Sequence, residues 1–94
     1  MEAGHLATIT PGAISGTGTI ALDGPVFGGA DINADGTNSA VVVVRDNDAN
    51  GEILLDSNTT VGKTIFGPFR APSKQIYYDI SGTGGSATLY EWKK

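Results

Sequence analysis

Short runs of apolar and β-branched residues, each broken after about ten residues by Gly, Pro, Asn or Asp, constrain this chain more than any other feature of its sequence. Side chains of a strand alternate between two faces, and the interrupting residues are those that turns require. We therefore expect eight strands, at residues 5–9, 17–22, 26–32, 39–46, 51–57, 63–70, 74–81 and 86–92. This spacing predicts an all-β fold, either an antiparallel β-sandwich or a jelly-roll-like barrel of about seven or eight short strands.

Composition supports this fold class. The 14 glycines are about twice the average usage, and the chain lacks stretches rich in strong helix formers. Its 94 residues fit a single β-sandwich domain over residues 1–94, of which residues 1–5 are expected to be a flexible or partner-contacting arm. Because the chain contains no cysteine, disulfides and thiolate metal sites are excluded.

The most distinct hairpin joins the fourth and fifth expected strands, where Asn50 and Gly51 can supply the positive φ angles of a tight turn. The four valines at residues 41–44 make both faces of the fourth strand apolar, as in a central strand. One face is expected in the core, and the other needs cover from a loop or from another subunit. We therefore consider Val42 and Val44 candidate interface residues.

A second hairpin ends the chain and concentrates the aromatic residues. Tyr90 and Trp92 are two residues apart in the last expected strand, so they lie on one face, and Tyr77 is in the strand before it. Core or subunit packing is the first reading of these three side chains, which makes them interface candidates. Stacking against a sugar ring is the alternative, since aromatic faces serve carbohydrate-binding modules in this way.

Gly67 and Pro68 interrupt the sixth expected strand. Proline has no amide hydrogen to donate, so it cannot sit in a central ladder. That strand is therefore expected to be bulged or to lie at an edge of its sheet.

Two segments begin like the calcium loop of an EF-hand, but neither completes it. The candidate oxygen ligands are Asp31, Asn33 and Asp35 in the first segment and Asp46, Asp48 and Asn50 in the second. The glutamate required at the twelfth position is replaced by Val42 and Ser57, and the flanks read as strands instead of helices. Asp, Asn and Gly also favour β-turns, so we interpret both segments as turns and predict no metal or other cofactor.

Several function classes are disfavoured by charge and residue content. Residues 1–58 hold eight acids and one base, whereas residues 59–94 hold five dispersed bases and two acids, which is unlike the basic stripe of a nucleic-acid binder. The longest aliphatic run is four residues, against about 20 for a membrane-spanning helix. The single histidine, His5, has no evident catalytic companion, so we predict no enzymatic activity and no catalytic residues.

The sequence also resembles a known class of proteins. Residues 32–40 (INADGTNSA), the valine strand that follows, and residues 76–87 (IYYDISGTGGSA) resemble small glycine-rich structural proteins of tailed bacteriophages, particularly those of marine or cyanobacterial phages. The resemblance implies a virion component, and a 94-residue domain is more similar to a capsid decoration (cement) protein than to a tail fibre. It carries over no functional residues.

The expected function is therefore to stabilise the phage head by bridging capsomers. The implied partners are the major capsid protein and further copies of the chain, with a trimer favoured because it matches three-fold positions. The implied location is the capsid surface, after assembly in the bacterial cytoplasm, which agrees with the absence of a recognisable secretory signal. The alternatives are a carbohydrate- or receptor-binding module that uses Tyr90 and Trp92, and a calcium-dependent β-domain.

Overall fold

The structure, a computed structural model, describes residues 4–93, which form eight β-strands and no helix. In chain order the strands are β1 (His5–Thr8), β2 (Gly16–Ala21), β3 (Val26–Asn33), β4 (Ala40–Asp46), β5 (Ile53–Thr59), β6 (Lys63–Arg70), β7 (Gln75–Ser81) and β8 (Ser86–Lys93). Each begins and ends within two residues of an expected run. Residues 1–3 of the expected terminal arm lie outside the described residues, and His5 already belongs to β1.

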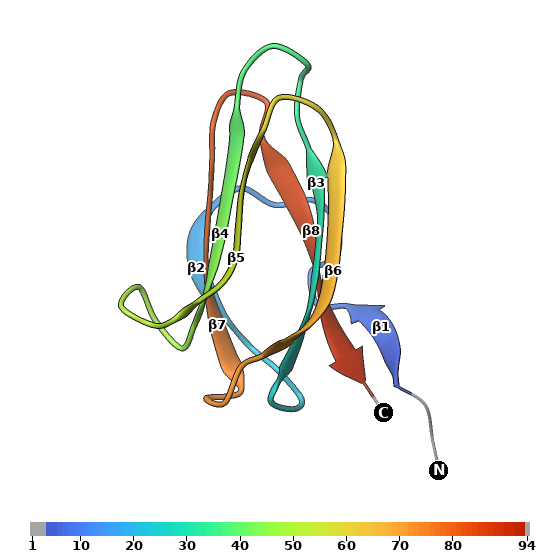
Figure 1. Cartoon of the computed structure of the whole chain (residues 1–94), viewed down its shortest axis with the longest axis vertical. Helices are drawn as coiled ribbons and strands as arrows, with labels where there is room; N and C mark the ends of the chain where they lie inside the picture. Colours follow the sequence, from blue (N-terminus) through green and yellow to red (C-terminus); the bar gives the residue numbers. More distant parts are fainter. Residues whose placement is uncertain (1–3, 94) are drawn as a thin grey trace.

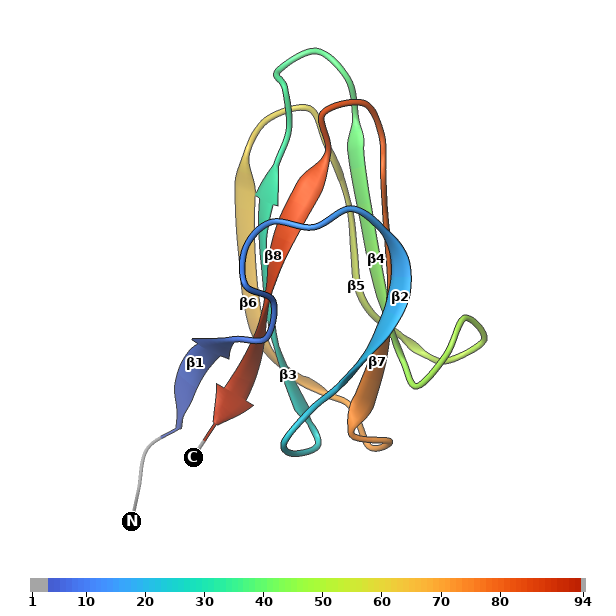
Figure 2. The same cartoon turned by 180° about the vertical axis from the view of Figure 1, so that it is seen from behind.

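The strands form two facing antiparallel sheets. Sheet I has the order β1-β8-β3-β6, and sheet II has the order β2-β7-β4-β5 (Figures 1 and 2). Strand β1 pairs with β8, β2 with β7, β3 with β6 and β4 with β5, so the chain resembles one long hairpin rolled into a sandwich. This is the strand order of a jelly roll, and the all-β prediction is confirmed. The described residues contain no helix long and apolar enough to cross a membrane.

The core lies between the two sheets and receives side chains from both. Its largest fully buried members are Phe27, Ile32 and Leu89 from sheet I and Val42, Val44, Ile76 and Ile80 from sheet II. Phe69 extends the core at the edge of sheet I, with its ring centroid 5.9 Å from that of Phe27. Alternate residues of each strand point inward, as the period of two predicts.

The valine strand requires a correction. Val42 and Val44, which we considered interface candidates, are both 0% exposed and belong to the core. The outward pair is Val41 and Val43, which remain half-buried on the outer face of sheet II. Four consecutive valines do not reveal which alternate pair faces inward, and strand order decided it. Val43, for example, lies between Asp56 and Asp79 on the neighbouring strands of sheet II.

The connection between β4 and β5 is also longer than the predicted tight turn. Residues 47–52 separate the two strands, and the positive φ angle falls at Asn47 (70°) instead of at Asn50 or Gly51. Glycine is needed at position 51 for a different reason, because a Cβ there would collide with the carbonyl oxygen of Asp46. The hairpin itself is confirmed, and its loop projects from the side of the sandwich (Figure 1).

Strand β6 confirms the expectation drawn from Gly67 and Pro68. It is the edge strand of sheet I, and its pairing with β3 shifts register where these two residues lie. The same register shift affects the pairing of β3 with β8, at Gly28. Proline at this position leaves no amide hydrogen for a further strand, which protects the edge from pairing with another chain.

Candidate functional site

The outer face of sheet I carries four large apolar side chains, which we call the aromatic patch. The patch consists of Leu6 on β1, Phe66 on β6, and Tyr90 and Trp92 on β8. Tyr90 and Trp92 alternate with the buried residues Leu89 and Glu91, so they point away from the core. Leu6 lies directly opposite Trp92, and Phe66 is 47% exposed. The predicted shared face of Tyr90 and Trp92 is confirmed.

Two glycines of β3 form the floor of the aromatic patch. Gly29 faces Tyr90 on one side and Phe66 on the other. Since Gly29 has no side chain, the two rings meet across β3 edge to face, with centroids 5.3 Å apart and planes at 84°. Gly29 has a φ of 128°, and a Cβ there would collide with the backbone of β6. At Gly28 a Cβ would collide with Leu6, so this side chain packs directly on the β3 backbone.

A polar strip continues the same outer face beyond the patch, and it holds two of the calcium candidates. Asp31 faces Thr64 and Thr88 on the neighbouring strands. The Thr64 hydroxyl donates a hydrogen bond of 3.1 Å to Asp31 Oδ1. The Asn33 amide donates one of 3.3 Å to the Ser86 hydroxyl. Both candidates therefore take part in cross-strand contacts.

The third candidate of that segment, Asp35, organises the loop between β3 and β4. Its Oδ1 accepts hydrogen bonds from the backbone amides of Thr37 (2.8 Å) and Asn38 (2.7 Å), and its Oδ2 accepts one from the Asn38 side chain (2.8 Å). These bonds lower the pKa of Asp35 below its ordinary value of 3.8, and the largest effect comes from the backbone amide of Asn38. The carboxylate therefore acts as the turn-former that the residue types predicted.

The second calcium segment shows the same local use of its oxygens. Asp46 accepts hydrogen bonds from the backbone amide (3.2 Å) and hydroxyl (3.1 Å) of Ser73. Asp48 Oδ1 accepts one of 2.9 Å from the backbone amide of Asn50. Among residues 4–93 no three His, Cys, Asp or Glu side chains gather where they could hold a metal ion. The two segments lie in turns and strand ends, as the turn interpretation expected.

Tyr77, the remaining interface candidate, lies on the other side of the molecule. It occupies the outer face of sheet II, between Thr19 and Arg45, and is half-buried. The candidates Tyr77, Tyr90 and Trp92 therefore do not share one surface. Among the interface candidates, Tyr90 and Trp92 are brought together on one surface, whereas Val42 and Val44 lie together in the core.

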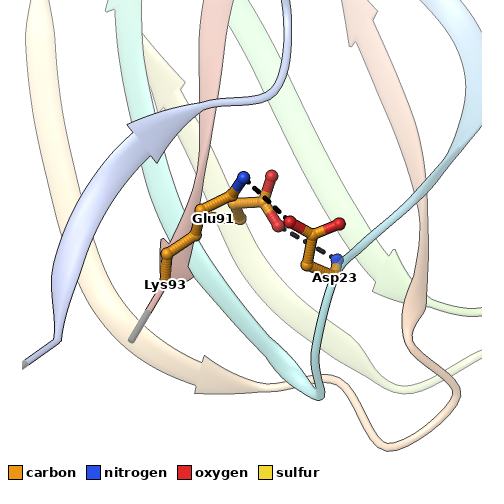
Figure 3. A network of polar contacts seen from close by, with 3 residues as sticks. All are labelled: Asp23, Glu91 and Lys93. Atoms are coloured by element: carbon orange, nitrogen blue, oxygen red, sulfur yellow. Dashed lines mark hydrogen bonds and ion pairs between the residues drawn. The ribbon is translucent and has the colours of Figure 1, made fainter.

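Below the aromatic patch, a cavity of about 300 Å³ opens where the turn between β2 and β3 meets the end of β8. Its lining residues are Asp23, Gly24, Pro25, Val26, Trp92 and Lys93. The ammonium of Lys93 forms an ion pair of 2.8 Å with Asp23 Oδ2 (Figure 3). The backbone amide of Asp23 donates a hydrogen bond of 3.0 Å to Glu91 Oε1, which ties the turn to β8. Trp92 belongs to both the cavity and the aromatic patch.

At this end of the molecule the Lys93 ammonium lies close to two carboxylates. Glu91 points inward and is only 7% exposed, whereas Asp23 lies at the surface. The hydrogen bond and the charge of Asp23, with a smaller effect from Glu91, raise the pKa of Lys93 above its ordinary value of 10.5. Lys93 therefore keeps its positive charge at neutral pH beside two carboxylates.

Sequence reasoning missed Phe66, Leu6, Asp23 and Lys93. The adjacent glycines at positions 28 and 29 were an available signal, because glycine inside a strand marks a bulge or a close approach of another group. No local signal connects Asp23 with Lys93, since their contact depends on the rolled strand order.

Comparison with known protein families, with curated proteins and with solved structures found no match for this chain.

Proposed function

We propose that the protein is a structural component of a tailed-phage virion, most specifically a capsid decoration (cement) protein that stabilises the head by bridging capsomers. The observation that supports this proposal is the aromatic patch on the outer face of sheet I. A cement protein requires no chemistry, but it requires a rigid body with a surface that adheres to neighbours.

The composition of the patch favours contact with protein. Trp, Tyr, Phe and Arg are enriched where protein interfaces carry most of their binding energy. The patch supplies Phe66, Tyr90 and Trp92, and Arg70 lies beside it, opposite Val26 on the edge strand. An exposed phenylalanine on a sheet face is costly to leave in water, so a partner that covers it gains apolar burial.

The proposed partners are other copies of the chain, as a trimer, and the major capsid protein. The jelly-roll order suits such a role by analogy, since it recurs in viral capsid domains, although it also recurs in lectins. Backbone packing supports a defined shape of the patch, because Leu6 lies against Gly28 and Phe66 against Gly29. The proposed location is the capsid surface, after assembly in the host cytoplasm.

Cryo-electron microscopy of phage particles that contain this protein tests the proposal. The expected result is density for the jelly roll at repeated positions on the capsid, with the outer face of sheet I against a neighbour. A particle assembled with the Phe66→Asp variant should lose that density, whereas one with Ile53→Asp should keep it, because both residues are 47% exposed but Ile53 lies on sheet II. Density on the tail alone would contradict the cement role.

A carbohydrate- or receptor-binding module is the second candidate. It is favoured by the common face of Tyr90 and Trp92, which presents two aromatic rings beside a strip of hydroxyl, amide and carboxylate groups. A glycan array probed with the wild-type chain and with Trp92→Ala distinguishes it from the structural role. Binding that disappears in a folded Trp92→Ala variant would favour this candidate. If the wild type bound none of the glycans on the array, the candidate would be excluded.

A further inference from the structure

The cavity beside Trp92 combines features that point to a particular class of ligand. Its volume of about 300 Å³ stands at the small end of the range for ligand sites, which suits one ring better than an extended chain. The cavity lies where the outer face of sheet I ends, next to the turn between β2 and β3. Figure 3 shows Asp23 of that turn beside Glu91 and Lys93 of β8. It is distinct from the ring pair of Phe66 and Tyr90 that forms the centre of the aromatic patch.

The turn that forms one wall of the cavity is fixed by three backbone groups. The Leu22 amide donates to the Lys74 carbonyl (2.9 Å), and the Pro25 carbonyl accepts from the Ala71 amide (2.8 Å). Between them the Asp23 amide donates to the buried Glu91 carboxylate. A wall held at three points needs little ordering when a ligand binds, so less binding energy is lost to conformational entropy.

The polar groups of the cavity are suited to hydrogen-bond two adjacent hydroxyls of a ligand. Asp23 offers carboxylate oxygens as acceptors, and Lys93 offers ammonium hydrogens as donors, with the two groups 2.8 Å apart. A hydroxyl both donates and accepts, so two neighbouring hydroxyls can bind this pair without separating its charges. Both side chains are accessible, with 71% of Asp23 and 39% of Lys93 exposed.

The remaining wall is apolar. Trp92, Val26 and Pro25 provide an indole and aliphatic surface beside the ion pair. A sugar ring has a face of C–H groups that packs against such a surface while its hydroxyls point to polar partners. Among the lining residues, the Asp23 carboxylate offsets the Lys93 ammonium, so the cavity offers an anionic ligand little net attraction.

We infer that this cavity binds a single neutral sugar ring, with adjacent hydroxyls on Asp23 and Lys93 and its apolar face against Trp92. The inference goes beyond the proposed assembly role; it deepens the second candidate function by naming a ligand and a site, and it rests on that candidate. A particle protein with such a site would attach weakly to surface glycans through each copy, and many copies on one particle would make the attachment strong.

Trp92 provides a direct readout, because it is the single tryptophan of the sequence. Its fluorescence is followed while the protein is titrated with glucose, galactose, mannose or N-acetylglucosamine. The expected result is a saturable change for at least one sugar, with half-saturation on the order of 1 mM, which is reasonable for so small a ligand.

The variants locate the binding. Asp23→Asn keeps the backbone amide that donates to Glu91 but loses the carboxylate, so it should lower the affinity for the selected sugar about tenfold. Lys93→Met should weaken it similarly, whereas the control Asp56→Asn, on sheet II, should bind like the wild type. No saturable change with any of the sugars, or equal half-saturation in Asp23→Asn and the wild type, would overturn the inference. Phe66 does not line the cavity, but Trp92 belongs to both the cavity and the aromatic patch. Phe66→Asp, which should lose the proposed assembly contact, should therefore bind the sugar at least as tightly as the wild type, and weaker binding would overturn the inference.

Discussion

The outer faces of the two sheets differ in what surrounds their apolar residues. On sheet II, Val43 lies between Asp56 and Asp79 on the neighbouring strands, so the apolar side chain is enclosed by charges. On sheet I, Gly29 lies between Tyr90 and Phe66 on the neighbouring strands, and it has no side chain. The acidic face therefore suits contact with water, whereas on the aromatic face Phe66 and Tyr90 are in direct contact. The difference shows that glycines, as much as aromatic residues, shape the aromatic patch.

This contrast depends on backbone that only glycine can supply. Gly29→Ala should destabilise the fold by about 3 kcal/mol or more, because φ is 128° and the new Cβ would collide with the backbone of β6. Gly36→Ala should cost about 1 kcal/mol, since φ there is 89° but no atom is near. Gly12→Ala, in open space without a positive φ, should be close to neutral. Urea unfolding of the three variants measures these losses of stability, and any other order would contradict the prediction.

The inner and outer valines of β4 provide a second test. Val42→Ala should destabilise the protein by about 2 to 3 kcal/mol, because it removes fully buried methyl groups and leaves a cavity. Val43→Ala, one residue away on the acidic outer face, should cost about 0.5 kcal/mol. Chemical denaturation measures both free energies. Equal losses would mean that the outer face of sheet II is covered as completely as the core.

The loop between β3 and β4 should show a smaller, pH-dependent effect on stability. Asp35 has a lowered pKa in the folded chain, so its carboxylate stabilises the fold above the ordinary value of 3.8, and this contribution is lost as the pH falls through the lower folded pKa. Asp35→Asn should therefore lose less stability than the wild type when the pH is lowered from about 6 to about 3.

Thermal unfolding at the two pH values measures this difference. Asp48→Asn, in the projecting hairpin loop, is a suitable comparison. Asp48 accepts one backbone hydrogen bond and a long side-chain bond of 3.4 Å from Asn47, whereas Asp35 accepts two backbone bonds and a side-chain bond of 2.8 Å. If Asp35→Asn lost as much thermal stability as the wild type between the two pH values, other carboxylates would be responsible for the loss.

The strands could be predicted from the sequence because Gly, Pro, Asn and Asp mark nearly every break between them. The common face of Tyr90 and Trp92 followed from the alternation of a strand alone. Strand order could not be derived in this way, because it depends on which distant strands pair. For that reason the inward pair of valines was misassigned, and the contact of Phe66 with Tyr90 across Gly29 was not anticipated.

The candidate site depended even more on long-range pairing. The cavity unites the turn after β2 with the last residues of β8, and its ion pair joins Asp23 to Lys93. The acidic segments that looked like calcium loops were local features, and their interpretation as turns rested on local chemistry. Local patterns therefore described the turns well, whereas the surfaces proposed for binding arise from the rolled topology.

The aromatic patch as an assembly surface is the central claim, and native mass spectrometry tests it most directly. The wild type and Ile53→Asp should both appear as trimers at micromolar concentration, whereas Phe66→Asp should be a monomer. A carboxylate in the patch would have to be buried at the interface without a compensating positive charge, which is unfavourable. A strictly monomeric wild type, or a Phe66→Asp variant that assembles like the wild type, would contradict the account.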